Sequence, residues 1–470
     1  MRRWLILLVC ALGVLGASAA ERFNLLLITA DDLNGDSMGW MGSKLGATPN
    51  IDAFAQSCHR FAHHHVTVPI CQPSRSAFMT GRVPHRNGAL GFHPINPDVP
   101  TLPDTLKNAG YFTAGINKLA HMKPDTRFPW EMRHDGSGKN PKLLGQQVAE
   151  CLKAAADAKK PFFINANITD PHRPFPQSEQ ESARKGKGNK NKKAGKSEAN
   201  DSVVKSFPAS ELVIPGMLEE LPDIRKEIGQ YFSGVNRFDQ SFGEIIGALK
   251  TSGQMDNTVI VFLSDHGISA PFSKATLYRN GTWTPLLLRF PGMGKPSVNK
   301  TDFISSVDIM PSVLEILGVK APEGMDGRSF VPLLKGQKQP NRDYVITHVN
   351  SVSSGKSFPS RCIRTHNFSY IWNAWPDGQT QYRVEAMNGL TFNALARAGE
   401  SDPVLKERVQ HWLFRTPEEF YDISKDPNER RNLINDAAAK KEIDRLKKIL
   451  LAHMEKTNDP QLAKFKATLP

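Results

Sequence analysis

Four apolar, β-branched runs, each followed by polar residues, are the feature of this 470-residue chain that most restricts its fold. The runs are Phe23 to Thr29, Tyr111 to Ile116, Pro161 to Ile168 and Thr258 to Leu263. Apolar runs of this length are typical of strands that are covered on both faces, as in parallel sheets. In open α/β sheets, ligands gather at the carboxyl ends of the strands. The polar residues that follow the four runs are therefore expected at a functional site on that edge of the sheet.

Helical patterns lie between these runs. Residues 223–250 carry apolar side chains at three- and four-residue spacing, which predicts one long amphipathic helix. Alternating strands and helices predict an α/β fold with a large, mostly parallel sheet flanked by helices.

After about residue 340 the pattern changes. Residues 361–372 have the composition of a strand, a short strand and turn begin at Phe420, and residues 435–455 predict a basic amphipathic helix. We expect a large α/β domain over residues 21–340 and a smaller C-terminal α+β subdomain over residues 341–470.

Residues 1–20 have the composition of a secretory signal peptide. A basic start is followed by an apolar run from Trp4 to Gly16 and by the small residues Ala17-Ser18-Ala19. The apolar run is too short to span a bilayer, and no other stretch reaches transmembrane length. We expect a secreted or periplasmic protein without stable membrane insertion.

The formal net charge of the chain is +13 with histidine neutral, and loss of Arg2 and Arg3 with the signal would leave 13 − 2 = +11. Such an excess favours a polyanionic partner through long-range electrostatic steering.

Acidic residues follow the first and last runs. Asp31 and Asp32 stand side by side after the first, and Asp265 and His266 follow the last. Adjacent carboxylates repel each other unless a cation offsets their charge, and three Asp with few soft ligands favour a hard divalent ion, Ca²⁺ or Mg²⁺. The alternative is that these residues cap loops, where Asp is common.

The stretch Cys71-Gln72-Pro73-Ser74-Arg75 carries the most specific pattern in the chain. Taken alone, it is compatible with a buried structural cysteine ahead of a helix that has Pro73 in its first turn. It also resembles the C-x-P-S-R signature of the type I sulfatases, whose cysteine is oxidised to formylglycine by a formylglycine-generating or equivalent enzyme. The resemblance implies an alkaline phosphatase-like sulfatase fold, a catalytic domain over residues 21–340 and a sulfated saccharide as substrate.

The resemblance also assigns a metal site. It implies that the divalent ion, Ca²⁺ in first place and Mg²⁺ in second, is bound by Asp31, Asp32, Asp265 and His266, and that the oxygen of formylglycine at position 71 completes the shell. A Cys71 thiol would be a poor ligand for a hard ion, which is a physical reason to expect its conversion.

The implied mechanism begins with attack on sulfur by one hydroxyl of hydrated formylglycine, and the second hydroxyl later expels sulfate as the aldehyde forms again. The matching residues are Arg75 on the hydrate, Lys118 and His121 on the sulfate and hydrate, His172 beside the leaving group, and Lys274 as a last cation on the sulfate. Such preorganised cations stabilise the charge that develops in the transition state.

Further blocks recur in family order, among them Thr48-Pro49-Asn50, Asp170-Pro171-His172, Ser264-Asp265-His266-Gly267 and Glu419-Phe420-Tyr421-Asp422. The run from Ser264 to Leu287 is similar to the heparan N-sulfatase (sulfamidase) branch, and the iduronate 2-sulfatase branch is the competitor. Three positions depart from the pattern. His266 stands where many members have Asn, Asn117 where Gly is usual, and Lys274 where the sulfamidase branch has Arg, which binds sulfate with a different geometry.

Two other functions remain open at this point. A phosphohydrolase of the alkaline phosphatase class shares the sheet and the metal position, but it usually needs a Ser or Thr nucleophile. A non-catalytic polyanion-binding protein would use the surplus charge and the basic residues of the segment 181–197, which we expect to be a solvated loop. An exported protein with this motif favours a sulfated polymer, so we expect no nucleic-acid partner. The histidine run His63-His64-His65 is expected to be structural.

Overall fold

The structure of the protein, a computed structural model, describes residues 22–136, 138–188 and 204–469. The expected signal peptide and residues 189–197 of the basic segment lie outside these ranges.

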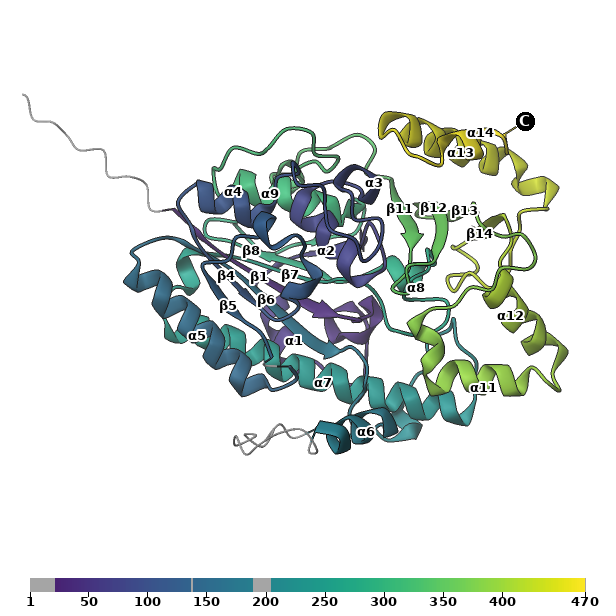
Figure 1. Cartoon of the computed structure of the whole chain (residues 1–470), viewed down its shortest axis with the longest axis horizontal. Coiled ribbons are helices and arrows are strands. Elements are labelled where there is room, and N and C mark those ends of the chain that lie inside the picture. Colours follow the sequence, from purple (N-terminus) through teal and green to yellow (C-terminus); the bar gives the residue numbers. More distant parts are fainter. Residues whose placement is uncertain (1–21, 137, 189–203, 470) are drawn as a thin grey trace, which may run out of the picture.

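An eight-stranded sheet forms the centre of the larger part of the fold (Figure 1). Its order is β5 (Met132–His134), β4 (Phe112–Ile116), β6 (Phe162–Pro171), β1 (Asn24–Asp31), β7 (Thr258–Ser264), β8 (Leu286–Arg289), β2 (His59–Phe61) and β9 (Val298–Asn299). The first five strands pair in parallel, and β8 is antiparallel to both of its neighbours. The four apolar runs are confirmed as strands, and they are β4, β6, β1 and β7, which are neighbours in the sheet.

Buried side chains cover both faces of this sheet, which explains why its strands read as continuous apolar runs. Leu26 and Ile28 of β1 belong to the core beneath α1 (Pro49–Ala55), α5 (Pro141–Asp157) and α7 (Pro222–Thr251). Leu25 and Leu27 belong to the core on the other face, beneath α2 (Cys71–Thr80), α4 (Leu102–Asn108) and α9 (Ile309–Ile316). The two helical layers are visible on either side of the sheet in Figure 1. The expected helix over residues 223–250 is confirmed as α7.

A second, antiparallel sheet forms the C-terminal part. Its order is β11 (Tyr344–Ser351), β12 (Ser357–Thr365), β13 (Phe368–Asn373) and β14 (Glu418–Asp422). Helices of this part are α11 (Leu390–Ala398), α12 (Pro403–Phe414), α13 (Lys440–Lys456) and α14 (Leu462–Lys466). The expected helix over 435–455 therefore begins at Lys440, after a short 3₁₀ turn. The sheet and helices agree with an α+β subdomain, while the boundary between residues 340 and 341 stays a prediction.

The remaining elements are short. They are α3 (Pro84–Asn87), α6 (Glu179–Gly188), α8 (Arg279–Thr282), α10 (Val331–Leu334), β3 (His64–His65) and β10 (Ile304–Ser305).

Two local predictions were wrong. Residues 361–372 were expected as one strand, but the chain reverses between β12 and β13, where the Thr365 hydroxyl accepts a hydrogen bond from the Phe368 amide. The segment 181–197 was expected as a loop, but residues 179–188 form α6. Ser178 caps this helix, since its hydroxyl accepts from the Glu181 amide.

Phe262 tests the packing of α7 on the sheet. Its ring lies 5.5 Å from that of Phe238 and 5.6 Å from that of Phe242, measured between centroids. Replacing it with Ala should lower the free energy of unfolding by about 3–5 kcal/mol, because the cavity cannot collapse fully. Val404→Ala, at a side chain that is 72% exposed, should change it little. Urea denaturation of both variants measures the difference, and equal effects would contradict this packing.

Candidate active site

The four neighbouring strands bring the expected site residues to one edge of the sheet. Asp31 ends β1, His172 follows β6, Lys118 lies just past β4, and Asp265 follows β7 directly. Cys71 is the first residue of α2, so the amino end of that helix points at the same place. The register of a parallel sheet thus places residues from distant parts of the sequence within reach of one another.

Acidic, thiol and imidazole groups form a compact cluster here. Ligand atoms of Asp31, Cys71, Asp265 and His266 lie within 4.8 Å of one another, and all four residues are buried. An overlapping group joins Asp31, Asp32, Cys71 and His172 in the same way. The sequence-predicted metal ligands are therefore brought together.

Cys71 lies at the centre of this cluster. Its Sγ is 3.1 Å from Nε2 of His266 and donates to Oδ1 of Asp31 at 3.7 Å. Burial raises the pKa of the thiol well above its ordinary value, and neighbouring carboxylates add to the effect. An unmodified Cys71 is therefore protonated at neutral pH and is a weak nucleophile.

Arg75 lies one helical turn after Cys71 and is fully buried. Its guanidinium donates to Oδ2 of Asp265 at 2.8 Å, and it also donates to Oδ1 of Asn167 at 2.6 Å. Sequence reasoning missed Asn167, although an amide inside the apolar run of β6 is a usable signal. Asn167 fixes the position of Arg75 without contacting the thiol.

Two lysines balance the remaining carboxylates. Nζ of Lys118 is 2.5 Å from Oδ2 of Asp31, and Nζ of Lys274 is 2.9 Å from Oδ1 of Asp32. Burial alone would raise the pKa of Asp31, but Lys118 and other nearby cations hold it well below its usual range. Burial opposes the charge of Lys274, yet the nearby acidic groups raise its pKa well above the ordinary value. Asp31, Lys118 and Lys274 are therefore charged at neutral pH.

The turn after β4 explains why Asn117 can stand where Gly is usual in the sequences that the chain resembles. Asn117 and Lys118 both have left-handed backbone conformations, with φ of 56° and 55°. Glycine adopts this conformation most easily, and Asn tolerates it better than most other residues. Asn117 also donates from its side chain to the carbonyl of Asn167 at 3.1 Å. The turn directs Lys118 into the cluster.

His121 lies on the 3₁₀ turn that follows Lys118, Leu119–His121. Burial, and then Lys118, lower its pKa to about 4, so the imidazole is neutral at neutral pH. Its ring packs edge-on against Phe92, with centroids 5.5 Å apart.

His172 and Lys274 share a partner that sequence reasoning missed. Glu385, from the C-terminal part, lies 3.5 Å from Nε2 of His172 and 2.8 Å from Nζ of Lys274. Burial would raise the pKa of Glu385, but Lys274 and then His172 lower it to about 2. Nothing in its local sequence marks this residue, because only the tertiary fold brings it to the strand ends.

The donor set fits a divalent cation. Oδ2 of Asp32 is buried and has no hydrogen-bond partner among the described residues. Nδ1 of His266 lies 3.0 Å from the carbonyl oxygen of Gly267, which holds Nδ1–H, and Nε2 faces Cys71. Three carboxylates and one such imidazole suit a hard ion better than a soft one.

Other histidines that the sequence drew attention to lie elsewhere. His64 and His65 form β3, and their rings contact Thr284 and Thr282. His85 faces His348 and Asp459 of the C-terminal part.

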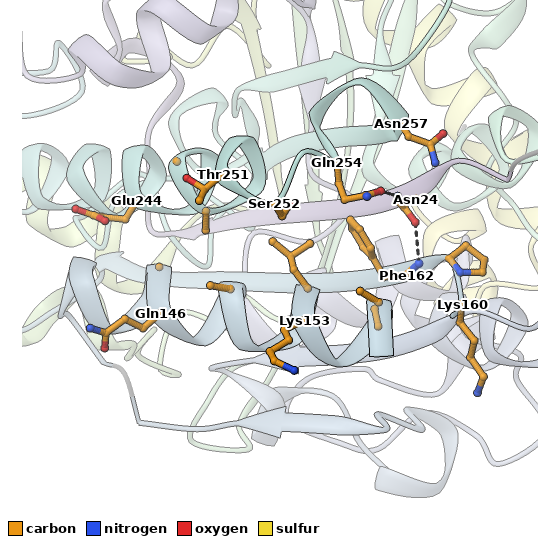
Figure 2. A pocket seen from close by; sticks show the side chains of 18 of the residues that line it. Asn24, Gln146, Lys153, Lys160, Phe162, Glu244, Thr251, Ser252, Gln254 and Asn257 are labelled. Atoms are coloured by element: carbon orange, nitrogen blue, oxygen red, sulfur yellow. Dashed lines mark hydrogen bonds between the residues drawn. The ribbon is translucent and has the colours of Figure 1, made fainter. Parts of the chain in front are cut away.

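A wide hollow lies elsewhere in the described part of the chain. It measures about 1350 Å³ and lies between α5 and α7, at the amino ends of β1 and β6. Figure 2 shows Gln146 and Lys153 on one wall and Glu244 and Thr251 on the other. Asn24 lies between Phe162 and Gln254 and is hydrogen-bonded to both. None of the sequence-predicted site residues lines it.

Comparison with known families decides the class of the protein. The family model described as sulfatase matches residues 23–319, more than half of the chain. The chain belongs to the sulfatase family. A second model, the C-terminal domain of N-sulphoglucosamine sulphohydrolase, matches residues 265–376. The protein is thus a type I sulfatase similar to the sulfamidase branch, as the sequence predicted, and is a sulfuric ester hydrolase.

Curated relatives agree with this class. Human N-sulphoglucosamine sulphohydrolase is 28% identical, with 96% of this chain and 94% of that protein covered. An ulvan-active sulfatase from Formosa agariphila is 27% identical, with 94% and 82% covered.

Solved structures confirm the alkaline phosphatase-like sulfatase fold. A Bacteroides thetaiotaomicron protein from a glycosaminoglycan-metabolism locus superposes with a TM-score of 0.70 at 21% identity, covering 94% of this chain and 98% of that one. An enzyme in complex with its substrate D-glucosamine-2-N,6-O-disulfate superposes with a TM-score of 0.67 at 20% identity, covering 93% and 99%. Within the described residues of the sulfatase, none of the helices is long and apolar enough to cross a membrane.

Glu385 gives a test of how the C-terminal part serves the site. In Glu385→Gln, Lys274 loses a charge-assisted hydrogen bond of 2.8 Å and keeps only Asp32 as a close acidic partner. Such a bond contributes about 1.5–3 kcal/mol, so kcat/KM for sulfate release should fall roughly tenfold to a hundredfold. Glu400→Gln, an exposed control, should be neutral. Unchanged kinetics in Glu385→Gln would mean that this carboxylate does not contribute to catalysis.

Proposed function

We propose that this sulfatase is an exported, formylglycine-dependent enzyme that uses Ca²⁺ to remove sulfate from a saccharide, with N-sulfoglucosamine residues as the first candidate substrate. The observation that carries the proposal is the convergence of Cys71, its carboxylate neighbours and two lysines at the strand ends.

Conversion of Cys71 to formylglycine resolves a conflict in the site. A protonated thiol in contact with His266 and Asp31 is neither a good nucleophile nor a good ligand for a hard ion. When present, the formylglycine hydrate supplies an oxygen nucleophile and the divalent ion supplies charge stabilisation for it. In this proposal Arg75 holds the group at position 71, and its guanidinium is itself fixed by hydrogen bonds to Asp265 and Asn167.

Binding of the divalent ion and of the substrate would separate acidic and basic side chains that now pair with each other. Asp31, Asp32, Asp265 and His266 are the proposed ligands, and Ca²⁺ fits better than Mg²⁺ because this many protein ligands suits its higher coordination number. With the aspartates committed to an ion, Lys118 would be free to bind sulfate oxygens, and Lys274 could bind them while it keeps its pair with Glu385. Both ammonium groups are held charged by their acidic neighbours, so they provide preorganised stabilisation of a sulfate group.

In this proposal His172 donates a proton to the leaving group. Its Nδ1 lies 2.6 Å from the carbonyl oxygen of Arg173, which fixes the ring orientation, and its Nε2 faces Glu385. Because the Arg173 carbonyl holds Nδ1, Nε2 is the nitrogen left to face the leaving group. His121 is neutral and would offer a hydrogen bond to the sulfate or hydrate rather than a charge.

The choice of substrate rests on similarity and on charge. The matching C-terminal domain model and the human relative are both named for N-sulphoglucosamine hydrolysis. Lys274 stands where that branch has Arg, so an O-sulfate ester of a saccharide is the alternative within the same class. The positive net charge of the chain favours a polyanionic substrate in either case. Export is supported by the composition of residues 1–20.

Removing the divalent ion tests the proposed ligands. Dialysis of the matured protein against a strong chelator should abolish sulfate release and lower its melting temperature, because the clustered carboxylates lose their counter-charge. Added Ca²⁺ should restore both. Asp32→Asn should lose most activity and should show a smaller calcium-dependent thermal shift, whereas Asp256→Asn, at a side chain that is 94% exposed, should behave like the parent. Full activity in metal-free protein would overturn the proposal.

A defined substrate screen tests the reaction. Protein made with a formylglycine-generating enzyme should release sulfate from N-sulfoglucosamine or from O-sulfated mono- and disaccharides. Cys71→Ala should lower the rate by at least about 10⁴-fold, because the covalent route is lost. Release of phosphate from phosphate esters, without release of sulfate from any sulfated sugar, would support the phosphohydrolase alternative. Binding of sulfated polymers without any turnover by the parent would support the non-catalytic one.

A further inference from the structure

A second group of metal-ligating side chains lies outside the catalytic site. Ligand atoms of His85, His348 and Asp459 lie within 4.8 Å of one another. His453 lies beside them, with its Nε2 3.3 Å from Nε2 of His348. The ring centroids of His85 and His348 are 5.6 Å apart, and those of His348 and His453 are 5.3 Å apart. Two imidazoles and one carboxylate thus meet in one place, and the imidazole of His453 lies next to them through His348.

The four residues come from separate elements at the junction of the two parts of the fold. His85 lies on α3, the short helix that follows the Cys71 helix, and belongs to the larger part. His348 lies in β11, His453 in α13, and Asp459 just beyond α13, all in the C-terminal part. Figure 1 shows α3 facing β11 and the α13 region. An ion bound here would link the two parts.

His348 is buried, and ring nitrogens of His85 and His348 lack ordinary partners. Within the described residues, neither ring nitrogen of His85 nor Nδ1 of His348 has a hydrogen-bond partner, although these atoms are buried. Leaving such groups unpaired costs free energy, and each unpaired group in a native structure needs an explanation. Burial lowers the pKa of His85 and of His348, and it lowers the pKa of His453 to about 4. All three imidazoles are neutral at neutral pH, the form that binds metals.

We propose that His85, His348 and Asp459, with His453 as the fourth side chain, bind a Zn²⁺ ion that joins the C-terminal part to the segment after the Cys71 helix. Two nitrogen ligands on one tetrahedral Zn²⁺ ion, each about 2.0–2.1 Å from the ion, are about 3.3 Å apart. The Nε2 atoms of His348 and His453 are separated by 3.3 Å. A set of three His and one Asp suits Zn²⁺ and excludes Ca²⁺, which prefers oxygen ligands.

Arg361 is the main group that opposes a cation here. Its guanidinium donates to both carboxylate oxygens of Asp459, at 2.6 and 2.8 Å. Arg361 also donates to the carbonyl of Val349 and to Oδ1 of Asn350, both at 2.9 Å, so it stays satisfied if Asp459 shares one oxygen with an ion. A carboxylate has lone pairs enough for both partners.

Zinc content and thermal stability test the proposal on the matured full chain. The protein is stripped with a chelator, refilled with Ca²⁺ to occupy the catalytic cluster, incubated with an equimolar amount of Zn²⁺ and desalted. The parent and the control His366→Gln, at an exposed histidine, should each retain about one zinc ion per chain. His348→Gln and His85→Gln should lose zinc affinity roughly tenfold to a hundredfold.

A second readout separates this site from the catalytic one. Zn²⁺ should raise the melting temperature of the parent and of His366→Gln, but not that of His85→Gln, whose side chain comes from the other part of the fold. Sulfate release at low temperature should be equal in all three, which keeps the result independent of the proposed catalytic mechanism. Equal zinc retention in the parent and both site variants, or no retention in any of them, would overturn the proposal and leave a neutral histidine cluster around the Arg361–Asp459 pair.

Discussion

Balance of buried charge at the carboxyl ends of four parallel strands is the constraint on which the rest of the site depends. Asp31, Asp32 and Asp265 are fully buried, and charged carboxylates are tolerated in such a place only when they are paired. Arg75, Lys118 and Lys274 supply that pairing. Under the proposed function, a divalent cation and a sulfate group would replace these ion pairs, so the charges that stabilise the site would also serve binding.

The scaffold explains why this arrangement can be held rigidly. Both faces of the sheet are covered by helices, so the strand ends have little freedom to move. The polar residues of the first layer are fixed by a second layer, in which Asn167 orients Arg75 and the turn at Asn117 directs Lys118. Catalytic geometry of this kind requires supporting contacts as much as it requires the reacting groups. The C-terminal part takes a share of that task, because Glu385 closes the site over His172 and Lys274.

Much of this fold and of the candidate site could be predicted from the sequence, and the reasons are physical. Buried parallel strands leave a continuous apolar signal, and polar residues after such strands share one edge, so Asp31, Lys118, His172 and Asp265 were expected together. Glu385 could not be predicted, because it reaches the site from a short 3₁₀ turn, Glu385–Asn388, far along the chain. The His85, His348 and Asp459 cluster is likewise assembled from separate segments with no regular spacing. The reversal between β12 and β13 was missed because apolar residues on both sides of the turn hide it.

The identity of residue 71 in active protein is the most direct test of the account. Preparations with different extents of maturation can be analysed by mass spectrometry of the peptide that contains position 71, alongside the rate of sulfate release per chain. We expect the rate to rise in proportion to the fraction of formylglycine and to extrapolate to zero where residue 71 is entirely a thiol. Full turnover by a preparation in which Cys71 is unmodified would contradict the central claim.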